Sequence, residues 1–382
     1  MARHPASVSS VLALASACPT LAAVAPSDNE IGYRYSHYQE ADAPANRVAS
    51  GSTERYQIDI HQLHWRQVIA EQWQLQAAAS LESMSGASAL QTYRNDAGQS
   101  EVIMSGASIE ERRTDGRISI SRFFDEGTLS AGYYQSQEND YAARAVNVSG
   151  ELELNQAHTV LSAGYSLSND TLNPSDANGI AQREAADGET KQTRDMYVGV
   201  SQILNRYEVI QLTLAQRYSD GYLSDPYRSI DVRPQERLGS SISLLYRFYM
   251  APWNGAWHWD YRYYKDDWEV ASHTLEGRWL QQLTDHVRWR IALRGYQQSE
   301  AEFYSLAATR ETSFQSSDAR LSAYGALTAS LGLDLGLDDV TVSIDWSQYE
   351  SREQWGPARN DADEAPSLVN YQLLSLGLLY RY

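Results

Sequence analysis

Arginines recur at even spacing in one segment of the chain and could attract anions. Arg288, Arg290 and Arg294 are two or four residues apart, so on a β-strand their side chains would point to the same face. Arg247 and Arg262 lie in neighbouring segments that alternate in the same way. Because rings of arginine inside a pore favour anions, the spacing predicts an anion-attracting ladder along the wall of a channel.

Acidic side chains on the same expected face leave a second interpretation open. Asp260 and Asp345 are predicted to point toward the arginines, as are three glutamates of earlier segments, Glu82, Glu151 and Glu153. These charges could pair across a narrow lumen and neutralise each other. If the lumen is open, we expect a slight preference for anions despite the net charge of -18.

Two loop motifs carry carboxylates. Asp225-Pro226-Tyr227 is either a turn, in which proline presets φ and aspartate caps the local backbone, or part of a loop that folds inward and constricts the lumen. Asp266-Asp267 is either a solvated hairpin tip or a site for calcium or a cation that bridges lipopolysaccharide. The spacing matches no calcium-loop motif, so we expect neither a metal nor a cofactor.

Catalytic groupings are not apparent in the chain. Ser272 and His273 are adjacent, which on a strand puts their side chains on opposite faces and prevents a nucleophile–base pair. His258 and Asp260 share a face but lack a serine partner. An outer-membrane hydrolase therefore ranks third among the functions considered, and we expect the protein not to be an enzyme. The negative charge also disfavours nucleic acid as a partner.

These side chains would be positioned by hairpins, of which the segment from Asn254 to Gln281 is the clearest. Alternate positions of its first arm are aromatic: Trp257, Trp259, Tyr261 and Tyr263. The positions between them are polar: His258, Asp260 and Arg262. A wholly aromatic strand face is typical of a transmembrane barrel, in which the apolar face meets lipid and the polar face lines the lumen.

Similar segments recur along the chain, and their connections alternate in length. We count about sixteen strands, an even number as in bacterial barrels. Odd-numbered connections are mostly long: 41–52, 84–106, 139–140, 170–191, 219–236, 265–267, 298–317 and 350–368. Even-numbered connections are short, such as Asp125-Glu126-Gly127. The chain is thus predicted to be all-β, a transmembrane antiparallel barrel with short periplasmic turns and long extracellular loops.

The two ends of the chain resemble targeting signals. Arg3 and His4 precede an apolar run, followed by small residues through Ala25, which predicts a signal peptide at residues 1–25 and a single barrel domain at 26–382. Cys18 is the only cysteine and would be lost with the signal, unless it carries a lipid. The terminal Tyr382 follows alternating apolar residues, a pattern that the outer-membrane assembly machinery reads.

The central motifs resemble an uncharacterised bacterial outer-membrane family, domain of unknown function 3570. The similar segments include Gly221-Tyr222-Leu223-Ser224-Asp225-Pro226-Tyr227, Tyr261-Arg262-Tyr263-Tyr264-Lys265-Asp266-Asp267-Trp268, Arg294-Gly295-Tyr296-Gln297-Gln298 and Glu138-Asn139-Asp140-Tyr141. The resemblance covers most of the chain after the signal. It implies a barrel in the outer membrane and no particular activity.

The leading functional hypothesis is a porin-like channel for small polar solutes or ions in the bacterial outer membrane. The alternative is a closed structural or adaptor barrel whose extracellular loops bind an unknown protein partner. In either case the expected surroundings are outer-membrane lipid and lipopolysaccharide. Lumen charges left unpaired would favour the channel, and interlocked pairs would favour the closed barrel.

Overall fold

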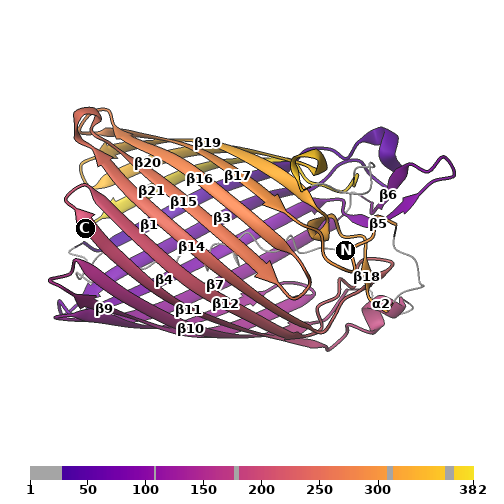
Figure 1. The fold of residues 1–382 in the computed structure, drawn as a ribbon, viewed down its shortest axis with the longest axis horizontal. Helices are drawn as coiled ribbons and strands as arrows, with labels where there is room; N and C mark the ends of the chain where they lie inside the picture. The colour runs from indigo at the N-terminus through magenta and orange to yellow at the C-terminus, as the bar shows by residue number, and fades with distance from the viewer. Residues whose placement is uncertain (1–27, 107–108, 176–179, 308–312, 358–364) are drawn as a thin grey trace.

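The computed structural model describes residues 28–106, 109–175, 180–307, 313–357 and 365–382. These residues form one closed antiparallel barrel of sixteen strands (Figure 1), so the predicted fold class and strand count are confirmed. The first eight barrel strands are β1 (Glu30–Glu40), β3 (Gln57–Ile69), β4 (Trp73–Gly86), β7 (Ile109–Phe124), β8 (Gly127–Gln137), β9 (Tyr141–Leu154), β10 (Thr159–Leu172) and β11 (Thr190–Asn205). The others are β12 (Glu208–Gly221), β14 (Glu236–Met250), β15 (Gly255–Asp266), β16 (Ala271–Gln282), β17 (Val287–Gln298), β19 (Tyr324–Leu337), β20 (Val340–Arg352) and β21 (Tyr371–Arg381). The predicted signal peptide lies outside the described residues.

Pairing of the first and last strands closes the barrel, because β1 pairs with both β3 and β21. At one end of the barrel, here called the turn end, tight turns join the strands. Ala70, Glu71 and Asp338 adopt positive φ there, the conformation that two-residue hairpins require. Nearly all the long connections lie at the opposite, loop end. The predicted asymmetry of the loops is confirmed.

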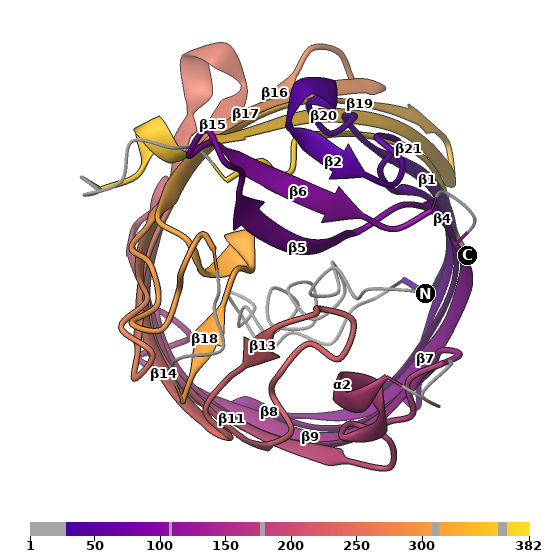
Figure 2. The ribbon, with the colours of Figure 1, turned by 90° about the vertical axis from the view of Figure 1, so that its right-hand side faces the viewer.

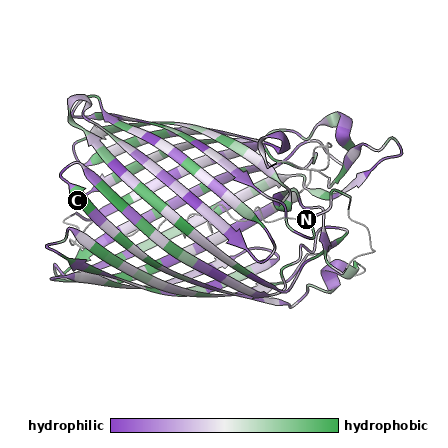
Figure 3. Cartoon of the chain, in the orientation of Figure 1, coloured by the Kyte–Doolittle hydropathy of each residue, from purple (hydrophilic) through white to green (hydrophobic). Residues whose placement is uncertain are grey.

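Alternation along each strand separates an apolar outer face from a more polar inner face, and Figure 3 shows the resulting stripes. Exposed apolar side chains keep one alternation within a strand, as Val146 and Val148 do on β9 and Leu331 and Leu333 on β19. The inner face is identified by Gln298 of β17, which donates hydrogen bonds to backbone oxygens of the loop that crosses the opening. Most of the outer face is therefore suited to lipid.

The start of β3 reverses this rule. Ile58 and Ile60 are buried with Tyr38 and Tyr56 on the inner face, whereas Asp59 lies on the outer face and accepts a hydrogen bond from Tyr35 Oη at 2.6 Å. The general expectation that the apolar alternation faces lipid is wrong here, because an apolar cluster inside the barrel buries these side chains.

The long loops carry small elements that fold across the loop end, as Figure 2 shows from that side. A three-stranded sheet contains β2 (Val48–Ser50), β5 (Ala89–Arg94) and β6 (Ser100–Met104). A two-stranded sheet pairs β13 (Asp231–Val232) with β18 (Gln315–Ser316). The helices are α2 (Ala181–Glu184) and the 3-10 turns η1 (Ala45–Arg47), η2 (Ala251–Trp253), η3 (Ala319–Leu321) and η4 (Glu353–Trp355). Within the described ranges, no helix has the length and apolarity to cross a membrane.

Candidate functional site

Arg288 and Arg290 lie on the inner face of β17 and form ion pairs with aspartates of neighbouring strands. Arg288 Nη2 is 2.8 Å from Asp334 Oδ2. Arg290 Nη2 is 2.9 Å from Asp334 Oδ1 and 2.6 Å from Asp345 Oδ1. Because both arginines have a carboxylate at contact distance, this part of the predicted ladder presents little net charge to the lumen.

The same pairing extends along the wall. Arg34 of β1 reaches Asp345 at 3.1 Å, so this aspartate serves arginines from two strands. Arg247 pairs with Asp260 across β14 and β15. The interpretation in which lumen charges satisfy each other therefore describes five of the predicted residues: Arg247, Asp260, Arg288, Arg290 and Asp345.

Arg262 and Arg294 differ from the other predicted arginines. No described carboxylate forms an ion pair with either one. Glu276 lies opposite Arg294 in the β16–β17 register, but its carboxylate accepts a hydrogen bond from Arg278 instead. The electrostatic neighbours of Arg262 are Arg217, Arg294 and two tyrosines. Both side chains are exposed on the inner face. Arg262 and Arg294 are thus two uncompensated positive charges on the inner face, on strands β15 and β17 that flank β16.

A row of tyrosines, which the sequence analysis missed, follows the inner face beside these arginines. It is defined here as the tyrosine row: Tyr296, Tyr324, Tyr349, Tyr371 and Tyr38, from the adjacent strands β17, β19, β20, β21 and β1. Ring centroids are 5.6 Å apart for Tyr296 and Tyr324, 4.7 Å for Tyr349 and Tyr371, and 4.7 Å for Tyr38 and Tyr371. Alternation along the strands could have revealed this row. Tyr296 lies two residues from Arg294 on β17, and Tyr349 lies four residues from Asp345 on β20, so each tyrosine shares a face with a residue predicted to point inward.

Asp225-Pro226-Tyr227 combines the two interpretations offered for it. Asp225 Oδ1 accepts a hydrogen bond from the backbone N–H of Tyr227 at 3.0 Å, which makes a local turn. The loop also folds inward, because Tyr227 is buried and donates a hydrogen bond to Asp140 of another loop. Loop 222–235 also meets the β4–β7 connection through the Ser229 N–H and Leu90 carbonyl, 3.3 Å apart. Loop 222–235 thus contacts two other connections at the loop end, which Figure 2 shows from that side.

Buried ion pairs join loop 222–235 to the β17–β19 connection. Asp318, only 1% exposed, lies 3.2 Å from Arg228 Nη2 and 3.0 Å from Arg233 Nη2. Arg233 also pairs with Asp231 at 2.6 Å. Burial alone would raise the pKa of Asp318, but Arg228, Arg320 and Arg233 together hold that pKa well below its ordinary value. These residues form what we call the mouth network: Asp225, Arg228, Asp231, Arg233, Asp318 and Arg320.

Asp266 and Asp267 differ from each other. Asp266 is buried and accepts hydrogen bonds from Arg237 Nε at 2.8 Å and from the backbone N–H of Val270 at 3.0 Å. It therefore organises the β15–β16 connection, and the expectation of a solvated tip is wrong for it. Asp267 is exposed and accepts from the backbone N–H of Leu238 at 3.0 Å.

Carboxylates cluster at two places in the described residues, and arginines accompany both. The first group is Glu111, Glu138 and Asp140, and the second is Asp225, Asp231 and Asp318. Arg113 Nε lies 3.5 Å from Glu138, and the second group belongs to the mouth network. The guanidinium groups supply positive charge to both clusters.

The predicted lipid-facing aromatics share the outer face of β15. Trp259 is 43% and Tyr261 38% exposed, while Trp257 stacks on Trp259 with ring centroids 5.5 Å apart. Tyr263 lies on the same alternation and contacts His273 at 5.0 Å between centroids. This arrangement matches the aromatic bands of membrane barrels.

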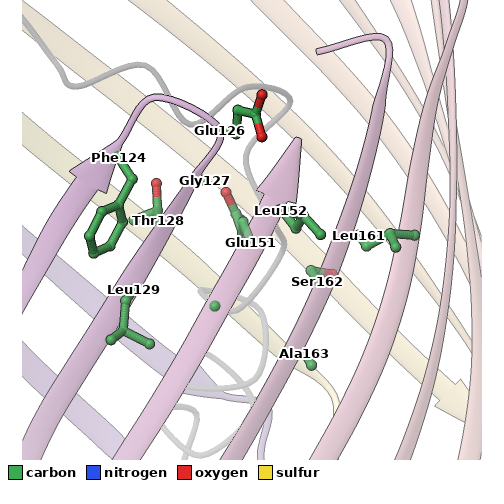
Figure 4. Close-up of a pocket in the computed structure, with 11 residues that line it drawn as sticks. Phe124, Glu126, Gly127, Thr128, Leu129, Glu151, Leu152, Leu161, Ser162 and Ala163 are labelled. Carbon is green, nitrogen blue, oxygen red and sulfur yellow. The ribbon is translucent and has the colours of Figure 1, made fainter. Parts of the chain in front are cut away.

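The structure brings no described nucleophile to a base at the predicted pair. Ser272 is buried on the inner alternation of β16, whereas the ring of His273 lies on the outer face and contacts Tyr261 Oη at 2.8 Å. A shallow pocket near the turn end lies between β8, β9 and β10 and is lined by Phe124, Leu129 and Leu152 among others (Figure 4). Its apolar lining belongs to the outer face, so the pocket does not open onto the inner arginines.

Comparison with known proteins gives a family and similar folds. A bacterial polysaccharide outer membrane secretin is 11% identical, with a TM-score of 0.48 and coverage of 92% of this chain and 98% of that chain. OccD3 (OpdP) of Pseudomonas aeruginosa is 9% identical, with a TM-score of 0.45 and coverage of 93% and 91%. A loop L8 deletion mutant of OmpT, an outer membrane protein of Vibrio cholerae, is 9% identical, with a TM-score of 0.44 and coverage of 93% and 99%.

No curated protein matches the sequence. A family model described as "Protein of unknown function (DUF3570)" matches residues 5–363. The resemblance drawn from the central motifs is therefore confirmed over nearly the whole sequence. The chain belongs to the DUF3570 family of proteins of unknown function.

Proposed function

We propose that this protein is a porin-like channel of the bacterial outer membrane that passes small polar solutes or ions. The observation that carries the proposal is the pair Arg262 and Arg294, two exposed positive charges on the inner face without carboxylate partners among the described residues. A protein that needed only a closed wall would gain nothing from placing like charges together, because they repel each other. Pores, in contrast, use such charges to select ions.

Planar-bilayer recording of the purified full-length protein tests the proposal directly. Discrete conductance steps are expected, and a polar solute should enter liposomes that contain the protein. If the protein inserts, as judged by protection of its barrel from protease, and never conducts, the channel proposal fails.

Ion selectivity gives a sharper prediction. The double variant Arg262→Gln/Arg294→Gln should lower the ratio of anion to cation permeability. A unit charge about 4 Å from an ion contributes about 1 kcal/mol in water, which favours an anion and disfavours a cation by the same amount. Removal of each arginine should therefore lower the ratio by about thirtyfold at most, and by less at physiological salt because of screening. Reversal potentials in a salt gradient measure the ratio.

The control for this variant is Arg194→Gln, which removes an exposed arginine from the outer face of β11. It should leave the ratio unchanged. Equal effects of the inner and outer substitutions would contradict a role of the inner pair in selectivity.

The proposed location predicts which segments cells expose. Outer-membrane barrels place long loops outside and short turns in the periplasm. Epitope tags inserted within 353–357 or after Gly188 should be accessible to antibody on intact cells, whereas a tag between Asp125 and Glu126 should be accessible only after permeabilisation. The reverse pattern would contradict the orientation. In this location lipid and lipopolysaccharide would surround the barrel, and the assembly machinery would recognise the strand before Tyr382.

The mouth network favours a second candidate function. Its buried ion pairs hold several loops together across the loop end, which suits a closed barrel whose loops bind a protein partner. Conductance separates the candidates, because the closed barrel would insert without conducting.

A further inference from the structure

The inner face of β15–β21 and β1 combines a cationic pair with an aromatic surface. Arg294 and Tyr296 are two residues apart on the inner face of β17, and Tyr296 continues into the tyrosine row through Tyr324, with ring centroids 5.6 Å apart. Arg262 lies on the inner face of β15, with its Cζ 5.9 Å from the Tyr264 ring centroid and with Arg294 among its charged neighbours. Charge and rings thus belong to one continuous surface.

The positive charges of Arg262 and Arg294 favour the binding of an anion at this surface. Arg262 has Arg217 and Arg294 as charged neighbours. Within the part of the chain that the structure describes, only Arg217 among these three forms an ion pair, with Asp195 at 2.6 Å. An anion between Arg262 and Arg294 would relieve their repulsion. The planar guanidinium fork matches a carboxylate through two parallel hydrogen bonds, which adds geometric selection to the charge.

The tyrosine rings beside this anion position favour a ligand that itself contains a ring. Four members of the tyrosine row, Tyr296, Tyr324, Tyr349 and Tyr371, are partly exposed on the inner face. Aromatic rings bind other rings through stacked or edge contacts, and the phenol hydroxyls supply hydrogen bonds at the same surface. Tyr38, Ile58 and Ile60 extend the apolar area next to Tyr371. Polar side chains alone would be sufficient for a simple ion pathway.

We propose that Arg262, Arg294 and the tyrosine row form a binding site for a carboxylate that is attached to a ring. This inference rests on the proposed channel function, for which it names the class of solute. Two sources share this chemistry, an aromatic acid and a sugar acid. A small anion such as acetate would use only the arginines, and a neutral ring only the tyrosines.

Calorimetric titration of the purified full-length protein in detergent tests the site without requiring conduction. The probes are benzoate and galacturonate, compared with acetate, benzyl alcohol and galactose. At least one of the two ring carboxylates should bind about tenfold more tightly than acetate and than its own neutral analogue. Binding of benzoate alone assigns an aromatic acid, and binding of galacturonate alone assigns a sugar acid.

Two variants separate the halves of the site. Arg294→Gln should weaken the ring carboxylate about tenfold or more, by loss of charge-assisted hydrogen bonds, and leave the neutral analogue unchanged. Tyr349→Leu keeps an apolar side chain and should weaken the ring carboxylate while leaving acetate unchanged. Arg194→Gln and Tyr33→Leu remove the same residue types from the outer face and should have no effect.

The outcomes distinguish this site from the channel itself. Binding with these variant effects in a protein that never conducts would overturn the channel and retain the site. Conduction without binding of either ring carboxylate, or binding that acetate matches, would overturn the site and retain the channel.

Discussion

Replacement of Asp318 by asparagine should release the loops that cross the barrel mouth and raise the conductance of each open channel. Asp318 is the acid that joins Arg228 and Arg233 of loop 222–235 to the β17–β19 connection. Removal of one partner from a buried ion pair costs about 3–5 kcal/mol, because the remaining charges stay buried. The loops can avoid this cost by leaving the mouth, while the sixteen-stranded wall stays intact.

Limited proteolysis and single-channel recording measure the release of the loops. Loop 222–235 should become susceptible to protease, and the barrel should keep its β-sheet circular dichroism. Asp267→Asn is the matched control, since Asp267 lies in a loop at the same end but is exposed. If Asp318→Asn leaves both protease resistance and conductance at the level of this control, the mouth network does not hold the loops.

The stabilisation of the loops by Asp318 in the natural protein should not be lost at moderately acidic pH. Folding lowers the pKa of Asp318 below its ordinary value of 3.8, since its three arginines outweigh burial. A carboxyl with a lowered pKa stabilises the folded loops above the ordinary value, and this stabilisation is lost only as pH falls toward the lowered one. The loops of the natural protein should therefore stay folded across the mouth from pH 7 to about pH 5.

The wall of the barrel was predictable from sequence because its signal is local. Trp257, Trp259 and Tyr261 alternate with polar residues within one strand, and lipid outside the barrel rewards that alternation directly. Alternation does not say which face is inside, however. Ile58 and Ile60 alternate as well as any lipid-facing pair, and they face inward because an inner cluster buries them.

The site was less predictable because it depends on register. Arg288 and Arg294 are the same residue type on the same face of β17, yet only Arg288 has an acid opposite it on β19. Its partner is Asp334, whereas the residue opposite Arg294 is Thr328. If the register between β17 and β19 were shifted, different arginines would lie opposite an aspartate, so a different set of charges would be neutralised. The sequence of either strand alone does not fix that register.

The loop end was the least predictable region. The mouth network joins Arg228 to Asp318, which are 90 residues apart. Arginine and aspartate in polar connections normally indicate solvent-exposed loops. Only the closed barrel brings the connections together and buries these side chains.

Introduction of arginine at Tyr261 should destabilise the barrel in lipid by about 2–4 kcal/mol. Tyr261 lies near the middle of β15 on the outer face, and its hydroxyl contacts His273 Nδ1 at 2.8 Å. An arginine there would place a charge at the hydrocarbon core of the bilayer, where the cost is greatest near the midplane and falls toward the interfaces. Reversible denaturant unfolding in vesicles measures the free energy.

The control is Thr213→Arg on the inner alternation of β12, opposite Ser243 of β14. An arginine at this position remains in the polar lumen, so the free energy of unfolding should change by less than about 1 kcal/mol. The comparison tests the facing of the strands without reference to transport. If Thr213→Arg lowered the free energy of unfolding more than Tyr261→Arg, the apolar face of β15 would not meet lipid. The assignment of outer and inner faces to the strands of the barrel would then have to be reversed.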